Sequence, residues 1–477
     1  MSRKWWTLAI VCVAIFMLLL DITVVNVALP SIQRDLHASF TDLQWVVDAY
    51  SLMLATVVLN AGSLADLLGR KRVFLVGVVL FTVASAACGA ATSPLFLNLA
   101  RGAQGIGGAV MFAVSLALLS QEFHGRERGT AFGIWGATVG AAVAIGPMVG
   151  GALTEWAGWR WIFFVNLPIG AACVLAGARV LHESRDDEHG GIDWLGQATL
   201  SLGVFGLVLG LLRGNDWGWS SGRVVGLFAG SAALLVAFVA AELVQEHPMF
   251  DVRLFKVPAF TGAQVVAFSI SSSMFAQFLY LTLYLQNVLG YSPVQAGLRF
   301  LPLSMISFFA APLSGRLSER VPVRLLLSGG LALVALALYL MYGVKDSSGW
   351  TTLLPGFLVG GIGIGMVNPP LASTAVSVVP PRQAGMAAGV NNTFRQVGIA
   401  TGIAGLGAIF QSALDPRLAH AITAGAVRTP QARHEFITGL NDILLVATFV
   451  ALAGAVLALA LVRRSDFVAS APRAEAA

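Results

Sequence analysis

Long apolar segments recur along the chain, and charged residues, glycine or proline separate each segment from the next. A helix needs about 20 mainly apolar residues to cross the hydrocarbon core of a bilayer, and these segments have that length. The pattern therefore predicts an all-α membrane protein with fourteen transmembrane helices. We place these helices at residues 5–29, 43–64, 73–92, 95–119, 129–153, 161–180, 193–212, 224–243, 258–283, 296–315, 324–343, 351–372, 394–412 and 440–462.

Two polar stretches, residues 182–190 and 245–256, divide the predicted helices into groups of six, two and six. The middle pair reads as an insertion between two bundles. We expect an N-terminal six-helix bundle at 1–181, a linker with two extra transmembrane helices at 182–256, a C-terminal six-helix bundle at 257–465 and a cytoplasmic tail at 466–477.

An internal repeat relates the two predicted bundles. At one constant offset, Gly62, Leu64, Asp66 and Lys71 match Gly315, Leu317, Glu319 and Arg324. A glycine-rich helix follows at a similar distance in each half, near Gly105 and near Gly361. Duplicated halves are typical of secondary transporters, in which the substrate site lies near the midplane between the repeats.

Composition narrows the class of protein. Only 11% of the residues are charged and 57% are hydrophobic, whereas a soluble domain is about 25% charged. The basic residues behind the net charge of +5 are scattered through loops, which argues against nucleic acid as a partner. All histidines and lysines lie in loops or the tail, and the three cysteines have no metal-site spacing. We therefore expect no metal and no cofactor.

Two further classes lack their sequence signatures. An enzyme needs a nucleophile with a base, and a primary pump needs a phosphate-binding loop; we find neither pattern. We expect the proton gradient to be the energy source. About 19 of the 29 basic residues, with Arg70 to Arg72 foremost, fall on the side that also carries both termini, which predicts that both termini are cytoplasmic.

Several short motifs follow one another along the chain. The first helix carries Leu20, Asp21, Thr23, Asn26 and Pro30; the next loop carries Gly62, Asp66, Gly69, Arg70, Lys71 and Arg72; later helices carry Arg101, Gln104, Gly105, Gly136, Gly140, Gly146, Pro147, Gly150, Asn391, Thr393, Arg395 and Gly398. With these motifs the chain resembles the major facilitator superfamily and, within it, the fourteen-helix drug:proton antiporters of the EmrB/QacA type. One departure is Leu67 and Leu68, where the loop motif usually has a further polar residue.

The resemblance implies a major facilitator fold, with two six-helix bundles plus two inserted linker helices. It implies proton-coupled efflux of lipophilic, often cationic drugs or toxic small molecules across the cytoplasmic membrane of a bacterium. The partners would be a small-molecule substrate, protons and the lipid bilayer, and the protein would function as a monomer. A dedicated exporter of a single metabolite, antibiotic or lipid stays open as the alternative.

Charged residues inside a bilayer are costly and mark functional sites. Deep in the predicted helices we find Asp21, Asp48 and Arg101, each about 9 to 12 Å below the outer surface at 1.5 Å per residue. The resemblance implies proton coupling by Asp21 and Arg101, and the shared depth suggests that Asp48 releases a second proton. The alternatives are a static ion pair and, for Asp48, a residue of the outer vestibule.

We expect gating by Gly62, Asp66, Gly69 and Arg70 and by Gly146, Pro147 and Gly150. A carboxylate such as Asp66 can cap a neighbouring helix and pair with arginine, while glycines four apart allow close helix packing. For substrate contact, polar groups among aromatic residues and methionine suit apolar ligands, which indicates Gln104, Met274, Gln277, Tyr280 and Tyr284. Hydrogen bonding between helices is the alternative role for these five.

Overall fold

The computed structural model describes residues 2–124, 126–185, 192–245, 248–318, 320–380, 383–414 and 429–463. These residues form helices and, within the described ranges, no strand. Twelve helices of the described chain are long and apolar enough to cross a membrane. This confirms the all-helical membrane class that the apolar pattern predicts.

The chain forms three successive groups of helices. The first group contains α1 (Arg3–Leu36), α2 (Phe40–Leu68), α3 (Arg70–Gly89), α4 (Pro94–Glu122), α5 (Arg126–Trp156), α6 (Trp161–Phe164) and α7 (Asn166–Val180). The second is the pair α8 (Trp194–Trp217) and α9 (Gly222–Val244). The third contains η1 (Val252–Lys256), α10 (Pro258–Ile270), η2 (Ser271–Phe275), α11 (Ala276–Leu283), η3 (Tyr284–Val288), α12 (Pro293–Leu317), α13 (Val323–Met341), η4 (Trp350–Leu353), α14 (Leu354–Ser377), α15 (Ala384–Ser412) and α17 (Pro430–Leu461).

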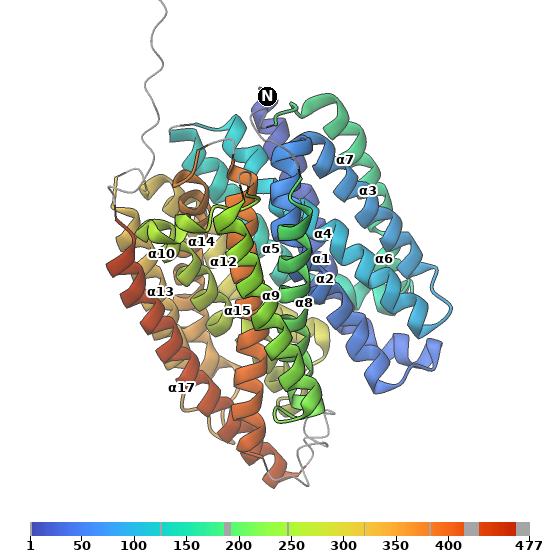
Figure 1. Ribbon diagram of the computed structural model, residues 1–477. Helices are drawn as coiled ribbons and strands as arrows, with labels where there is room; N and C mark the ends of the chain where they lie inside the picture. The colour runs from blue at the N-terminus through green and yellow to red at the C-terminus, as the bar shows by residue number, and fades with distance from the viewer. Residues whose placement is uncertain are drawn as a thin grey trace, which may run out of the picture.

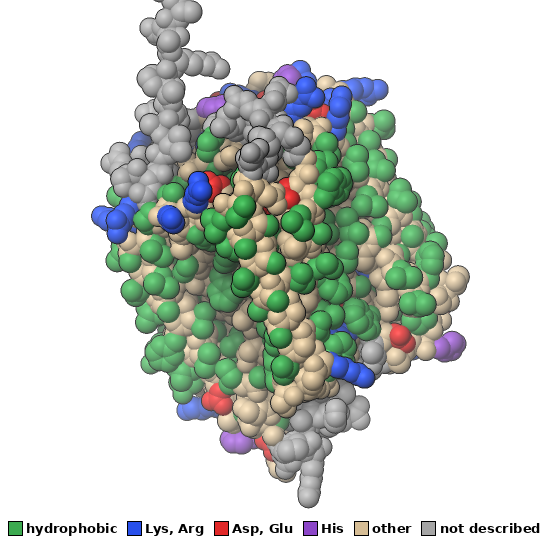
Figure 2. All heavy atoms as spheres, in the orientation of Figure 1, with side chains coloured by type: hydrophobic (Ala, Val, Ile, Leu, Met, Phe, Trp, Pro, Cys, Tyr) green, Lys and Arg blue, Asp and Glu red, His purple; other side chains and the backbone are tan. Residues whose placement is uncertain are grey.

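The helices run side by side between two ends of the molecule (Figure 1). Both the N-terminus and the C-terminal end of α17 lie at the upper end in this view. Hydrophobic side chains cover the side of the bundle, while lysine, arginine and the acidic residues gather toward its two ends (Figure 2). A surface of this kind suits a surrounding bilayer, in which a solvated charge is stable only near the interfaces.

Local sequence signals start several of these helices. Ser39 accepts a hydrogen bond from the Asp42 backbone N–H, and the Asp42 carboxylate accepts one from the Ser39 N–H, which forms a capping box before α2. Ser292 and Gln295 form the same box before α12. Each box satisfies two N–H groups that have no partner within the helix.

Two helices begin ten residues earlier than the apolar pattern predicts. We expected starts at 394 and 440, whereas α15 begins at Ala384 and α17 at Pro430. The pattern stopped at polar residues such as Asn391 and Asn392, but both side chains are buried against other helices and so lie inside the span. Polarity marks the surface of a helix only when the polar side chain faces water or lipid headgroups.

The predicted repeat is also seen in how one glycine of each half packs against a neighbouring helix. Gly105 of α4 abuts the Tyr50 carbonyl of α2 so closely that a Cβ would overlap it, and Gly361 of α14 abuts the Leu303 carbonyl of α12 in the same way. Tyr50 and Leu303 are separated by the offset that relates Gly62 to Gly315. The two halves therefore repeat their internal packing.

Other glycines join the first group of helices to the third. Gly62 of α2 meets the backbone of Gly385 on α15, and its repeat equivalent Gly315 of α12 meets the backbone of Gly129 on α5. A methyl group at any of these positions would overlap a carbonyl of the facing helix. The pair α8 and α9 packs beside this junction, because α8 contacts both α2 and α15.

We predict that Gly62→Ala destabilises this arrangement of helices by about 1 to 3 kcal/mol, the usual cost of overpacking. The matched control is Gly405→Ala on α15, since no atom lies within 4 Å of a Cβ built there. Thermal unfolding of the purified proteins measures both. Equal melting temperatures for Gly62→Ala and Gly405→Ala would contradict the close contact.

Candidate functional site

A buried polar network surrounds Asp21 on α1. Its carboxylate pairs with Arg101 of α4 at 2.5 Å, and the two side chains are 0% and 2% exposed. The other carboxylate oxygen accepts hydrogen bonds from Gln104 at 2.9 Å and from Asn166 at 3.2 Å. The network thus joins α1, α4 and α7 through a single carboxylate.

Arg101 also donates to the Gln104 side-chain oxygen at 2.7 Å and contacts α2. Its Nε donates to the Val46 carbonyl at 3.0 Å, and the guanidinium lies 4.3 Å from the centre of the Tyr50 ring. Removing one partner of a buried ion pair costs about 3 to 5 kcal/mol because the other charge is left unpaired. The role of Asp21 and Arg101 in proton coupling stays a prediction.

Asp48 does not join this network. It pairs instead with Arg213 of α8 at 3.0 Å, and Arg213 also pairs with Asp216 at 3.2 Å and stacks on Trp45 at 4.4 Å. The Asp48 side chain is 20% exposed, against 3% for Arg213. Its role in proton coupling stays a prediction, with a different arginine as its partner.

The expectation that Asp21, Asp48 and Arg101 are the only deep charges is wrong. Arg213 is buried because α8 continues to Trp217, beyond the predicted end at 212. Arg395 on α15 is also buried, since that helix starts earlier than predicted. The apolar pattern ends or starts a helix next to a charged residue, so it placed Arg213 just outside a helix and Arg395 at a helix end.

Asp66 bridges α2 and α15. Its carboxylate pairs with Arg70 at 2.8 Å and accepts hydrogen bonds from the backbone N–H groups of Gly385 at 3.1 Å and Met386 at 2.8 Å. These N–H groups open α15, where the helix dipole favours a negative charge. These hydrogen bonds confirm the expectation that Asp66 caps a neighbouring helix. Its gating role stays a prediction.

Gly69 turns the chain between α2 and α3. Its φ of 109° is one that residues with a Cβ rarely adopt, and a Cβ here would also approach the Glu183 carboxylate. Glu183 accepts hydrogen bonds from the N–H groups of Lys71 at 3.0 Å and Arg72 at 3.2 Å. Glu183, which sequence reasoning missed, thus holds the first turn of α3 from the segment after α7.

The glycines of α5 face two different helices. Gly146 and Gly150 lie against Thr23 and Val24 of α1, directly after Asp21. On the opposite side, Gly133 abuts Pro312 of α12. Pro147 lies within α5, and its side chain falls outside the described part of the chain.

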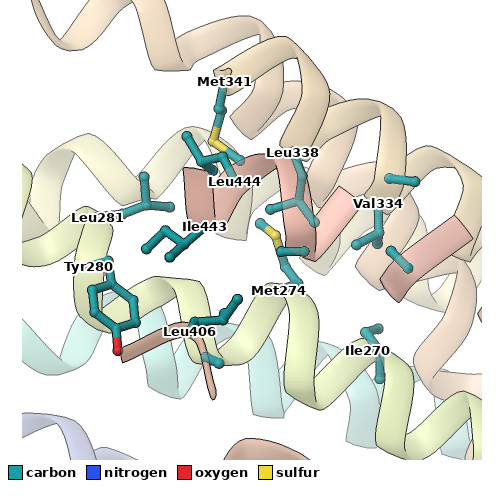
Figure 3. Close-up of a cluster of buried hydrophobic side chains, with 14 of the residues drawn as sticks. Ile270, Met274, Tyr280, Leu281, Val334, Leu338, Met341, Leu406, Ile443 and Leu444 are labelled. Carbon is teal, nitrogen blue, oxygen red and sulfur yellow. The ribbon is translucent and has the colours of Figure 1, made fainter. Parts of the chain in front are cut away.

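The residues expected to contact substrate are buried in packing contacts in this conformation. Gln277 donates to the Ile443 carbonyl at 2.9 Å, Tyr280 to Ile403 at 2.9 Å and Tyr284 to Ser348 at 3.1 Å. Met274 and Tyr280 lie in a hydrophobic cluster with Leu338 and Ile443 (Figure 3), and Gln104 belongs to the Asp21 network. These contacts match the alternative role between helices, and substrate contact by these residues stays a prediction.

A small cavity, with room for about one water-sized group, lies away from these residues, between α5 and helices of the third group. Its walls are mainly apolar, with three polar side chains. The lining residues are Val139, Gly140, Phe275, Phe278, Leu303, Ser304, Ser307, Ile364 and Asn368. Sequence reasoning missed this set; the serines three apart on α12 and the asparagine within apolar α14 were the available signals.

Comparison with known proteins identifies the family. Residues 11–403 match the sequence profile of the Major Facilitator Superfamily. The chain belongs to this superfamily. It is 36% identical over 421 residues to the multidrug resistance protein Stp of Mycobacterium tuberculosis, covering 87% of this chain and 78% of Stp. It is 37% identical over 445 residues to the puromycin resistance protein pur8 of Streptomyces alboniger, covering 92% and 88%.

A solved structure shares the major facilitator fold. The crystal structure of the human organic anion transporter MFSD10 superposes with a TM-score of 0.65, covering 94% of this chain and all of that chain. The sequences are 16% identical, so this likeness concerns the fold alone. The family and transporter-named relatives make this chain a major facilitator transporter, which is not an enzyme.

We predict that Asp66→Asn slows turnover of the transporter about tenfold while equilibrium binding of a transported dye changes less than twofold. The variant weakens charge-assisted hydrogen bonds to α15, each of which contributes about 1.5 to 3 kcal/mol. The matched control is Glu127→Gln, which removes an ion pair with Lys4 that is half exposed. Loss of dye binding with unchanged turnover would contradict a role in state exchange.

Proposed function

We propose that this transporter exports lipophilic drugs or toxic small molecules from a bacterial cell in exchange for protons. The observation that carries the proposal is the buried Asp21–Arg101 pair inside a membrane-spanning helix bundle. An ionisable pair at such a site is costly, and it commonly belongs to an ion pathway. The names of the relatives, which include multidrug and puromycin resistance, support the direction of transport and the kind of cargo.

A dedicated exporter of one compound is the second candidate. The relative from Streptomyces glaucescens, 35% identical over 412 residues, is named as a tetracenomycin C resistance and export protein, so a single cargo also occurs among similar chains. A screen over dyes, quaternary cations and neutral antibiotics separates the two candidates. The quaternary cations in this screen test the expectation that the cargo is often cationic.

The proposed architecture has fourteen transmembrane helices. Besides the twelve apolar candidates, α5 and α15 contain 31 and 29 residues, a length that suffices to cross a bilayer. In this proposal 1–181 and 257–465 are the two bundles, and α8 and α9 are linker helices within 182–256. Contacts of α8 with both α2 and α15 support a position beside the junction of the bundles.

The proposed orientation has both termini in the cytoplasm. Arg3 donates to the Val180 carbonyl and Lys71 to the Ala178 carbonyl, which gathers the N-terminus, the start of α3 and the end of α7 at one end. The basic run Arg70 to Arg72 lies there, as the positive-inside rule requires of the cytoplasmic side. We propose a monomer that needs no cofactor besides the proton gradient.

In the proposed cycle, a proton on Asp21 releases Arg101 and loosens α1 from α4. Gly146 and Gly150 of α5 pack on α1 beside Asp21, so a movement of α1 changes the packing of α5. The far face of α5 packs on α12 at Gly129 and Gly133. Movement of α1 therefore reaches the junction between the halves through a single helix.

We predict that Asp21→Asn abolishes uptake driven by a pH gradient in inverted proteoliposomes, with at least a hundredfold loss, while substrate exchange at equal pH stays within about threefold. A unit of pH supplies about 1.4 kcal/mol per proton, which the variant cannot use. Because the variant leaves Arg101 unpaired, the double variant Asp21→Asn/Arg101→Gln is the stability control. Full pH-driven uptake by a folded Asp21→Asn protein would refute the role of Asp21.

We predict that Asp48→Asn halves the charge moved for each neutral substrate molecule, if Asp48 carries the second proton. The membrane potential contributes about 2.3 kcal/mol per charge per 100 mV, so the slope of uptake against a potassium diffusion potential measures this charge. Asp216→Asn, which removes the more exposed partner of Arg213, is the control and keeps the slope. An unchanged slope in Asp48→Asn assigns Asp48 to a structural ion pair with Arg213.

A further inference from the structure

The cavity between α5, η2, α11, α12 and α14 has one polar wall. Ser304, Ser307 and Asn368 supply its polar groups, and the rest of the lining is apolar. Neither serine side chain forms a hydrogen bond with any other described residue. Because buried hydroxyl groups normally have partners, these two are available to a molecule in the cavity.

Arg395 lies directly behind this polar wall. It is 7% exposed, and its Nη2 donates to the Asn368 side-chain oxygen at 2.9 Å. Its Nε donates weakly to the Asn391 side-chain oxygen at 3.5 Å. In the part of the chain that the structure describes, no carboxylate pairs with Arg395, whereas Arg101 and Arg213 both have such a partner.

This contact fixes the orientation of the Asn368 amide. A guanidinium group only donates hydrogen bonds, so the oxygen of Asn368 must face Arg395. The amide NH₂ forms no hydrogen bond with the described residues and is left as a donor on the cavity side. The polar wall therefore offers donors from Asn368 and from two serines, backed by an unpaired positive charge.

The opposite wall lies close to the donors and offers aromatic surface. A Cβ on Gly140 would lie 3.5 Å from the Ser307 hydroxyl, and one on Gly136 would lie 3.6 Å from Asn368. Because these two positions carry no side chain, the backbone of α5 lies close to Ser307 and Asn368. Phe275 and Phe278, whose ring centres are 5.9 Å apart, line the cavity from η2 and α11. Aromatic rings of this kind suit a flat apolar body.

We propose that the carbonyl or carboxylate head group of an aromatic substrate occupies this small cavity on Asn368, Ser304 and Ser307, next to Phe275 and Phe278, and that Arg395 is the positioning residue that selects against cations. The proposal rests on the proposed export function and narrows its cargo. Charge interactions are strong in a site of low dielectric constant, so the unpaired guanidinium favours acceptors and acids over quaternary amines. The expectation of cationic cargo is the opposite outcome.

Three probes with one aromatic body test the selection: 2-naphthylacetate, its methyl ester and 2-naphthylmethyl-trimethylammonium. Equilibrium binding of the tritiated probes to the full chain in lipid nanodiscs is measured at neutral pH without a gradient. We expect the order carboxylate, ester, ammonium from tight to weak. Arg395→Gln should reduce the ratio of carboxylate to ammonium affinity at least tenfold, and Arg395→Lys should reduce it less.

Two further variants keep the test readable. Arg299→Gln removes a positive charge from α12, the helix that carries Ser304 and Ser307, but outside the cavity, where Arg299 stacks on Tyr291, and should leave the ratio within twofold. The double variant Ser304→Ala/Ser307→Ala keeps Arg395 and should weaken the carboxylate and the ester but not the ammonium. It tests the donors of the polar wall independently if Arg395→Gln does not fold, and Arg395→Lys then tests the guanidinium.

Tighter binding of the ammonium than of the carboxylate by the unaltered protein overturns the proposal. An equal loss for all three probes in Arg395→Gln, or no binding of either acceptor-bearing probe, also overturns it. The export assay is independent of this measurement. If pH-driven export fails while the binding order holds, the proposed function is refuted and the cargo selection stands.

Discussion

Contact between the backbones of facing helices is the constraint on which this conformation depends. Gly62 meets Gly385, and Gly129 meets Gly315. In lipid, helices associate through van der Waals packing and hydrogen bonds, because the surrounding tails are as apolar as the side chains. The close approach at Gly62 also brings the Asp66 carboxylate to the first N–H groups of α15. A methyl group on Gly62 or Gly385 would separate the carboxylate from these N–H groups, so the cap on α15 depends on the packing.

Buried charge is distributed unevenly through the helices. Asp21, Asp48 and Asp66 each pair with an arginine, which limits the cost of placing them among apolar residues. Arg395 has only amide oxygens as partners within the described chain. The proton-coupling candidate is therefore close to neutral as a unit, while the cavity region carries a positive charge. This difference separates the proposed proton-coupling site from the proposed cargo site.

α5 is the element that these two sites share. One face packs on α1 immediately after Asp21, through Gly146 and Gly150, and another face borders the cavity at Gly140. Helix interfaces have discrete arrangements and deform little within each one. In the proposed cycle, a change of contacts at α1 is passed to the cavity wall as a movement of the whole helix.

The sequence by itself determined the membrane class, most helix positions and the repeat, because lipid requires long apolar helices and a duplication preserves residue spacing. It also indicated Asp21, Arg101 and Asp66, since a charge or a glycine-flanked acid stands out from an apolar background. Which acid pairs with which arginine was decided only by the tertiary structure: depth along a helix placed Asp48 with Arg101, but the direction that its side chain faces placed it with Arg213. The cavity, too, depended on folding, because Ser307 and Asn368 are ordinary residues of apolar helices until α5, α12 and α14 bring them together. Periodicity fixes the depth and length of each helix, whereas the rotation of each helix about its axis is set by the neighbours against which it packs.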